Sequence, residues 1–258
     1  MRPDEIFSLA GQSSVGLSFE QPLETIESIA LGTLSLLEAI RLSDLDIRLY
    51  NAGSTECFGD TGNSVANEGS PFNPCSPYAV AKASAFWSVA NYRQAYGMYA
   101  CTGILSNHDS PLRPRRFVTR KITHAVAGLA LGRDVRLSLG NLGIERDWGW
   151  APEYVEAMAA MLNQSCPIDY IIATGKSHRL LEFVETAFKL IGKDWRDFVI
   201  IDEALMRPTD IVRNRVDPSN AMTGLGWKAK TGMAEVVGMM LQAEMANPHE
   251  EQASGNAQ

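Results

Sequence analysis

The sequence predicts an α/β fold in which short apolar strands alternate with helices around a parallel sheet. Its 258 residues are 45% hydrophobic and 21% charged, the balance of a globular protein. Residues 22–41 carry apolar side chains at helical spacing, and Pro22 suits a first helical turn. A strand over residues 47–52, a polar loop rich in Gly, Asn and Pro, and a second long helix over residues 78–96 follow.

The other elements follow from the same signals. A short strand over residues 4–10 is broken by Gly11, and further strands are expected at residues 98–106, 135–139, 169–173 and 198–201. We expect the strand at 169–173 to be the last of the main sheet. Helices are expected at residues 117–131, 152–162, 180–191 and 233–246, with a short helix after residues 217–221.

Charge and cysteine content exclude several classes of protein. The net charge of −7 argues against nucleic acid or an anionic membrane as the main partner. No apolar run has the length of a membrane span, and the N-terminus has no apolar signal core. The four cysteines form no CxxC pair and no cluster with His at metal spacing, so we expect no metal site and reduced thiols in a cytoplasmic protein.

The stretch over residues 51–82 carries the groups best suited to catalysis. Ser54 and Glu56 directly follow the strand, and the carboxyl ends of parallel strands are where such folds bind ligands. Tyr78 and Lys82 stand four apart in the first turns of a helix and therefore share a face. A lysine beside a tyrosine favours the phenolate, so we expect Lys82 to lower the pKa of Tyr78 and make it a base near neutral pH. A tyrosine and a lysine at this spacing are more commonly an exposed helical pair.

The combination of motifs is more specific than the pair. A strand followed by hydroxyl-x-Glu, a Gly/Pro/Asn-rich loop and SPYAVAK resembles the extended short-chain dehydrogenase/reductase superfamily. The later run NYRQAYGMYACTGILSNHDSPLRPRRFVTRKI is similar to the GDP-mannose 4,6-dehydratase family. The resemblance extends to about Met245. It implies a Rossmann-like parallel sheet, a smaller C-terminal substrate-binding region, NADP as cofactor, GDP-mannose or a similar sugar nucleotide as substrate, and a homo-dimer or tetramer.

The resemblance also implies roles for individual residues. The residues implied at the cofactor are Leu9, Ala10, Gly11, Gln12, Ser13, Tyr78, Lys82, His108 and Arg113. Those implied at the sugar nucleotide are Asn107, Arg120, Lys121, Arg146, Arg207 and Asp210, with Arg146 and Arg207 at the diphosphate and Asp210 at the guanosine ribose. The basic run over residues 113–121 could equally be a solvated surface. Asp147 and Trp148 are expected to order their loop. Ser14 stands where the family usually has histidine.

Members of the family begin with a strand, a GxxGxxG turn and two further β-α units before the segment that opens this chain. We therefore expect a sheet without its first three β-α units, a bare edge at the first strand, and weak NADP binding unless another chain completes it. The expected divisions are a truncated Rossmann-like domain with the catalytic residues (1–110), a mixed substrate-binding and Rossmann region with the strand near 168–173 (111–246), and a disordered tail (247–258).

The implied reaction turns GDP-mannose into GDP-4-keto-6-deoxymannose. Tyr78 would take the proton from O4 with Ser54 as a hydroxyl relay, and Glu56 would remove the C5 proton before water leaves C6. Two alternatives stay open at this point. One is a related epimerase or 4-keto reductase, which does not need Glu56. The other is an inactive subunit that only binds the sugar nucleotide.

Overall fold

A four-stranded parallel sheet forms the centre of the protein in this computed structural model, which describes residues 2–43 and 45–246. The strand order is β1-β2-β3-β7, and every neighbouring pair is parallel. The strands are β1 (Glu5–Ser8), β2 (Arg48–Ala52), β3 (Ala100–Leu105) and β7 (Tyr170–Ile172). All residues of β3 are buried, as expected for a parallel strand covered on both faces. The tail predicted from residue 247 lies outside the described residues.

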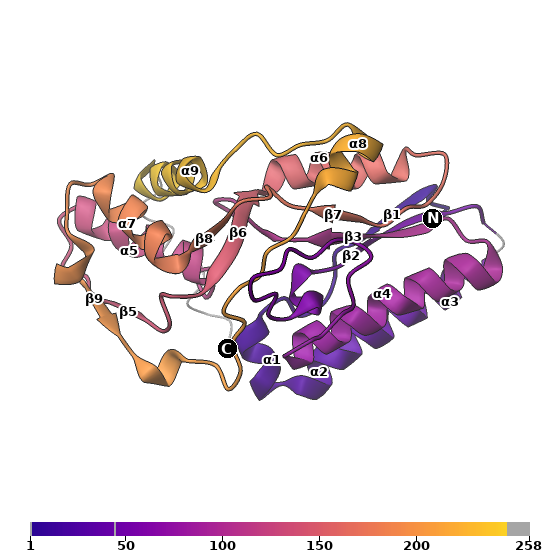
Figure 1. The fold of residues 1–258 in the computed structure, drawn as a ribbon, viewed down its shortest axis with the longest axis horizontal. Coiled ribbons are helices and arrows are strands. Elements are labelled where there is room, and N and C mark those ends of the chain that lie inside the picture. Colours follow the sequence, from indigo (N-terminus) through magenta and orange to yellow (C-terminus); the bar gives the residue numbers. More distant parts are fainter. Residues whose placement is uncertain (1, 44, 247–258) are drawn as a thin grey trace.

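Helices cover both faces of this sheet (Figure 1). One face packs against α3 (Gly32–Leu42) and α4 (Pro77–Tyr96), and the other against α6 (Ala151–Leu162) and α8 (Ser219–Leu225). Successive strand residues point to opposite faces. Leu49 accordingly packs with α3 and α4, whereas Tyr50 packs with α6. The sheet thus has two separate apolar layers, as the predicted α/β class requires.

The predicted helix over residues 22–41 is present but changes its winding. It consists of α2 (Pro22–Ile26), a π-helical segment η1 (Glu27–Leu31) and α3. A short preceding helix, α1 (Val15–Glu20), was not predicted. Ser14 caps α1, because its Oγ accepts a hydrogen bond of 3.3 Å from the Leu17 amide.

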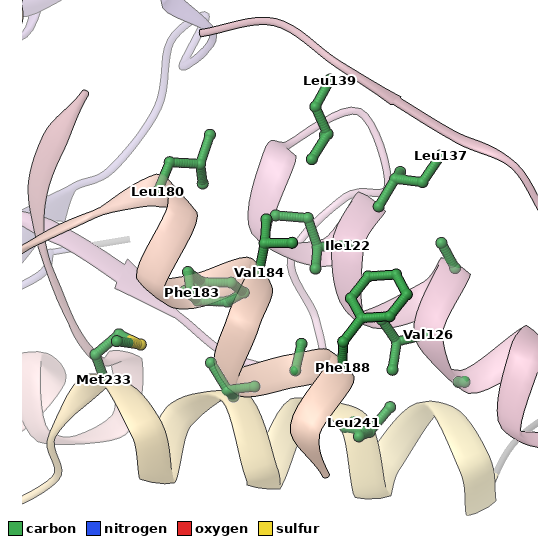
Figure 2. Close-up of a cluster of buried hydrophobic side chains, with 14 of the residues drawn as sticks. Ile122, Val126, Leu137, Leu139, Leu180, Phe183, Val184, Phe188, Met233 and Leu241 are labelled. Carbon is green, nitrogen blue, oxygen red and sulfur yellow. The ribbon is translucent and has the colours of Figure 1, made fainter. Parts of the chain in front are cut away.

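A second core lies between three helices and a short strand pair. The helices are α5 (Val118–Ala130), α7 (Leu180–Lys189) and α9 (Met233–Ala246), and the strands are β5 (Leu137–Leu139) and β9 (Val199–Ile201). Figure 2 shows the side chains of the three helices turned toward one another, with Phe183 and Phe188 contributed by α7. Burying each of these rings contributes roughly 1.5–3 kcal/mol. This core supports one side of the cavity described below.

A small mixed sheet joins the two cores. Its order is β4-β6-β8, from β4 (Asn107–Asp109), β6 (Glu145–Trp150) and β8 (Ser177–Arg179), with β4 parallel and β8 antiparallel to β6. The sequence analysis treated residues 145–149 as a loop, and this prediction was wrong. The segment is a strand because two other chain segments supply backbone partners, which local sequence does not reveal. Among the described residues, no helix has both the length and the apolarity needed to cross a membrane.

Candidate active site

Ser54, Glu56, Tyr78 and Lys82 meet at the carboxyl end of β2, as predicted, and line one cavity of about 540 Å³. Ser54 caps the 3-10 helix η2 (Thr55–Phe58), and its Oγ accepts a hydrogen bond of 3.2 Å from the Glu56 amide. Tyr78 and Lys82 lie in the first turns of α4. The capping Ser76 and Pro77 start this helix, so the sequence itself fixes where the tyrosine stands.

Lys82 does not act on Tyr78 as predicted. Its Nζ donates a hydrogen bond of 2.8 Å to the carbonyl oxygen of Ala52 and lies 5.8 Å from the centre of the Tyr78 ring. Burial raises the pKa of Tyr78 above its ordinary value, opposed by a hydrogen bond with Ser54 and, more weakly, by the charge of Arg113. Burial lowers the pKa of Lys82 to about 8. The prediction that Lys82 brings the Tyr78 pKa near neutrality is therefore wrong for this arrangement.

Glu56 forms a buried ion pair with Arg146 of β6. The Arg146 Nε lies 3.2 Å from Glu56 Oε1, and only 5% of the Arg146 side chain and 9% of the Glu56 side chain are exposed. Arg146 Nη1 also donates to the carbonyl oxygens of Ile211 (2.8 Å) and Glu145 (2.9 Å), and its Nη2 lies 3.5 Å from Asp210 Oδ1. The resemblance implied a diphosphate contact for Arg146, but its guanidinium is largely occupied by the protein.

The predicted cofactor segment after β1 lies only partly at the cavity. Leu9 and Ser13 line it, together with Ser14, whereas Ala10, Gly11 and Gln12 do not. Gly11 has φ +122°, and a Cβ there would lie 2.9 Å from Ile29 of η1, so the glycine is required for packing. The Gln12 side chain binds Thr25 Oγ1 of α2 at 3.1 Å. Gly11 and Gln12 therefore anchor this segment to the helix below it.

His108, Asn107 and Arg113 line the cavity from β4 and the loop after it. The His108 ring stacks on Tyr154 with 4.7 Å between centroids, and its Nδ1 lies 2.8 Å from the carbonyl oxygen of Ser106. Burial lowers the pKa of His108, so its imidazole is neutral at pH 7. Arg113 Nε donates a 2.5 Å hydrogen bond to the buried Asp109, which fixes its guanidinium at the cavity wall.

The remaining predicted substrate residues separate into two groups. Lys121, Arg207 and Asp210 line the cavity, and Lys121 Nζ donates a 2.7 Å hydrogen bond to the carbonyl oxygen of Ser138. Arg120 does not line it. Its Nε forms an ion pair with the buried Glu244 of α9, and its Nη1 donates 3.0 Å to the carbonyl oxygen of Arg113. The prediction that Arg120 contacts the sugar nucleotide is not what this placement supports, because the residue fastens α5 to α9.

The model of the family described as GDP-mannose 4,6 dehydratase matches residues 1–240. The chain belongs to the GDP-mannose 4,6-dehydratase family. GDP-mannose 4,6 dehydratase 1 of Arabidopsis thaliana is 47% identical over 249 residues, covering 95% of this chain and 69% of that protein. The Dictyostelium discoideum GDP-mannose 4,6 dehydratase is 44% identical over 264 residues, covering 95% of this chain and 74% of that protein. The predicted family and enzyme class, a sugar-nucleotide dehydratase, are confirmed.

Solved structures similar to this family member confirm the predicted fold. RMD from Pseudomonas aeruginosa, complexed with NADPH, has a TM-score of 0.86 at 22% identity, covering 95% of this chain and 82% of that one. The UDP-glucose 4-epimerase of Thermus thermophilus, in complex with NAD, has a TM-score of 0.82 at 27% identity, covering 95% and 78%. These likenesses support the Rossmann-like architecture of extended short-chain dehydrogenases.

Sequence reasoning missed two dehydratase cavity features and correctly assigned a third. Ser106 Oγ and the Tyr154 hydroxyl are 2.6 Å apart, and this pair carries the stacked His108. Ser106 ends β3 as Ser54 ends β2, so its position after a strand was a usable signal; Tyr154 gave none. Asp147 accepts hydrogen bonds from the amides of residues 174–176, which is the loop-ordering role expected of it. Among the described residues, no three His, Cys, Asp or Glu side chains gather at metal-binding distance.

Proposed function

We propose that this cavity is the active site of an NADP-dependent GDP-mannose 4,6-dehydratase, with Ser54, Glu56, Tyr78 and Lys82 as its reactive groups. The observation that carries the proposal is the buried carboxylate of Glu56 in the same cavity as the Tyr78 hydroxyl. A reductase or epimerase of this fold needs only the hydroxyl, phenol and lysine. A buried carboxylate costs free energy unless it is paired, and here it is paired by Arg146.

The residues at the base of the cavity fit the nicotinamide and ribose half of NADP. The ammonium of Lys82 and the hydroxyls of Ser54 and Tyr78 supply donors for hydroxyl groups, beside the apolar side chains of Leu9 and Leu105. The cationic Arg113 at the rim suits a phosphate. We assign Leu9, Ser13, His108 and the three residues named first to the cofactor side. The chemistry that NADP supplies when bound is the reversible transfer of a hydride to and from the sugar.

Tyr78 acts at the sugar O4. As hydride leaves C4, the O4 proton passes to the Tyr78 oxygen, and Ser54, which hydrogen-bonds Tyr78, shares that proton. The raised pKa of Tyr78 keeps the phenol protonated at rest, so the proton has to move in the same step in which C4 is oxidised. Lys82, tied to the Ala52 carbonyl, places a positive charge beneath this centre.

Glu56 acts at C5. The new 4-keto group acidifies the C5 hydrogen, Glu56 removes it, and the C6 hydroxyl leaves as water. Hydride then returns to C6 and a proton to C5, so the product is a 4-keto-6-deoxy sugar and no cofactor is consumed. Asn107, Lys121, Arg207 and Asp210 are assigned to the sugar nucleotide, because they line the same cavity beyond the reactive groups. Arginine and lysine are the side chains that suit a diphosphate.

The assembled protein is proposed to be a cytoplasmic homo-dimer or tetramer. The helices over residues 22–42 and α4 expose large apolar side chains, including Leu23, Leu31, Val80 and Trp87, with Leu23 78% exposed. Apolar faces of this kind are typical of helix–helix contacts between subunits. Among the described strands, β1 pairs with β2 alone, so its other edge is where a segment completing the sheet would add. Sedimentation analysis distinguishes these states.

The test is product formation. The protein is incubated with NADP+ and GDP-mannose, and the C6 methyl signal of a 6-deoxy sugar is followed by NMR. We expect the signal in the wild type and in Glu185→Gln, an exposed control on α7, and its loss in Glu56→Gln. A wild-type protein that binds GDP-mannose and leaves it unchanged, or that only inverts C4, contradicts the proposal.

A further inference from the structure

We propose that Arg146 is a positioning residue that holds the Glu56 carboxylate in its reactive orientation, rather than a ligand of the diphosphate. This inference rests on the proposed function. It concerns how the C5 base is kept in place, and it assigns the phosphate contacts to other cations of the cavity.

The contact between the two side chains is direct and buried. Arg146 Nε lies 3.2 Å from Glu56 Oε1, and neither side chain is more than 9% exposed. The Glu56 backbone is fixed independently, because its amide donates to Ser54 Oγ in the turn that opens η2. A backbone held at one end and a carboxylate held at the other leave the side chain with one orientation.

The rest of the Arg146 guanidinium is fastened to the protein. Nη1 donates to the carbonyl oxygens of Ile211 and Glu145, and Nη2 faces Asp210 at 3.5 Å. Arg146 itself belongs to β6, which is paired on both sides by β4 and β8. These contacts use three nitrogens in a fixed plane, a geometry that arginine provides and lysine does not.

Charges alternate from the base to the cavity rim. Glu56 meets Arg146, Arg146 meets Asp210, and Asp210 lies 3.5 Å from Arg207 Nη1. The exposed share of the side chains rises along this series, from 5% at Arg146 to 33% at Arg207. Arg207 therefore has surface to offer a diphosphate, whereas Arg146 is already enclosed.

The proposal predicts a specific kinetic change in Arg146→Gln and Arg146→Lys. A misplaced catalytic group costs about 100-fold for a displacement near 1 Å. We therefore expect kcat to fall about 100-fold while KM for GDP-mannose changes less than about threefold. Proton removal becomes rate-limiting, so the isotope effect measured with substrate deuterated at C5 increases. Arg207→Gln should instead raise KM and leave that isotope effect unchanged. Arg196→Gln, an exposed arginine of η3, is the matched control and should behave as wild type.

An Arg146 variant with raised KM, unchanged kcat and an unchanged C5 isotope effect overturns the inference, because that is the pattern of a diphosphate ligand. If Arg146→Gln does not fold, Arg146→Lys carries the test, since it keeps the positive charge beside Glu56.

A second readout needs no turnover. Amidation of Glu56 by a water-soluble carbodiimide and glycine amide, quantified by mass spectrometry, should be about tenfold faster in folded Arg146→Lys than in wild type, since a freed carboxylate reaches the reagent. Equal rates overturn the inference even if the wild type proves to have no dehydratase activity. Absent dehydration in the wild type, with faster labelling in the variant, would contradict the proposed function alone.

Discussion

The attachment of α9 to α5 provides a quantitative test of the role given to Arg120. Glu244 is buried, with 6% of its side chain exposed, and its two oxygens contact Arg120 Nε and His124 Nδ1, the latter at 2.9 Å. Removing one partner of a buried ion pair costs about 3–5 kcal/mol, because the remaining charge is left without compensation. For Glu244→Gln we expect a loss of about 3 kcal/mol, the lower end of that range, because Arg120 keeps its hydrogen bond to the Arg113 carbonyl.

The assay is urea unfolding of Glu244→Gln, Arg120→Met and the double variant. Since both single changes remove the same interaction, the double variant should lose much less than their sum, with a coupling free energy of about 2–3 kcal/mol. Arg196→Met, which breaks an exposed ion pair with Asp194, is the control and should leave stability close to unchanged. Additive losses would refute the reasoning. So would an Arg120→Met protein of wild-type stability that binds GDP-mannose tenfold more weakly, because Arg120 would then be a substrate ligand.

Three further predictions follow from the cavity. Glu56→Gln should reduce dehydration by at least about 1,000-fold while any 4-keto reduction persists, and NMR of the two products distinguishes these outcomes; continued dehydration would mean that another group is the C5 base. The Lys82 pKa of about 8 lies below its unfolded value, so its burial destabilises the fold fully below pH 8, and stability should rise between pH 8 and 10.5 by up to about 3 kcal/mol in urea titrations, an increase that Lys82→Met should remove. A Cβ at Gly149 would lie 2.6 Å from the Tyr154 hydroxyl, so Gly149→Ala should displace Tyr154 from the His108 stack and cost about 1–3 kcal/mol by thermal unfolding, with a neutral effect contradicting the packing.

The parts of the site that sequence predicts well are set by neighbouring residues. Ser76 and Pro77 start α4, so Tyr78 and Lys82 fall on its first turns whatever surrounds them. Ser54 and Glu56 follow β2 directly, and the strand carries them to its carboxyl end. Local chain geometry therefore brings all four reactive groups to one cavity, and the prediction needed no knowledge of long-range contacts.

The parts that sequence does not predict depend on contacts between distant segments. Arg120 and Arg146 both stand in runs typical of phosphate binding, but Arg120 meets a carboxylate 124 residues away, and Arg146 meets one 90 residues away. No spacing rule identifies such partners. The same limit explains β6, whose backbone partners lie near residues 108 and 178. A basic run indicates positive charge, and tertiary packing decides which cations remain free for a ligand.

The position of Lys82 shows why spacing alone misjudged the strength of the base. A buried ammonium must have an acceptor, and the side chain is long enough to reach the Ala52 carbonyl instead of the phenol. With Lys82 held there, the influences that lower the pKa of Tyr78 are the Ser54 hydrogen bond and the charge of Arg113, and burial outweighs both. Arg113 is in turn fixed by the buried Asp109. The base strength of Tyr78 is thus a property of the assembled cavity wall, to which β2, β4 and the loop after β4 each contribute a group.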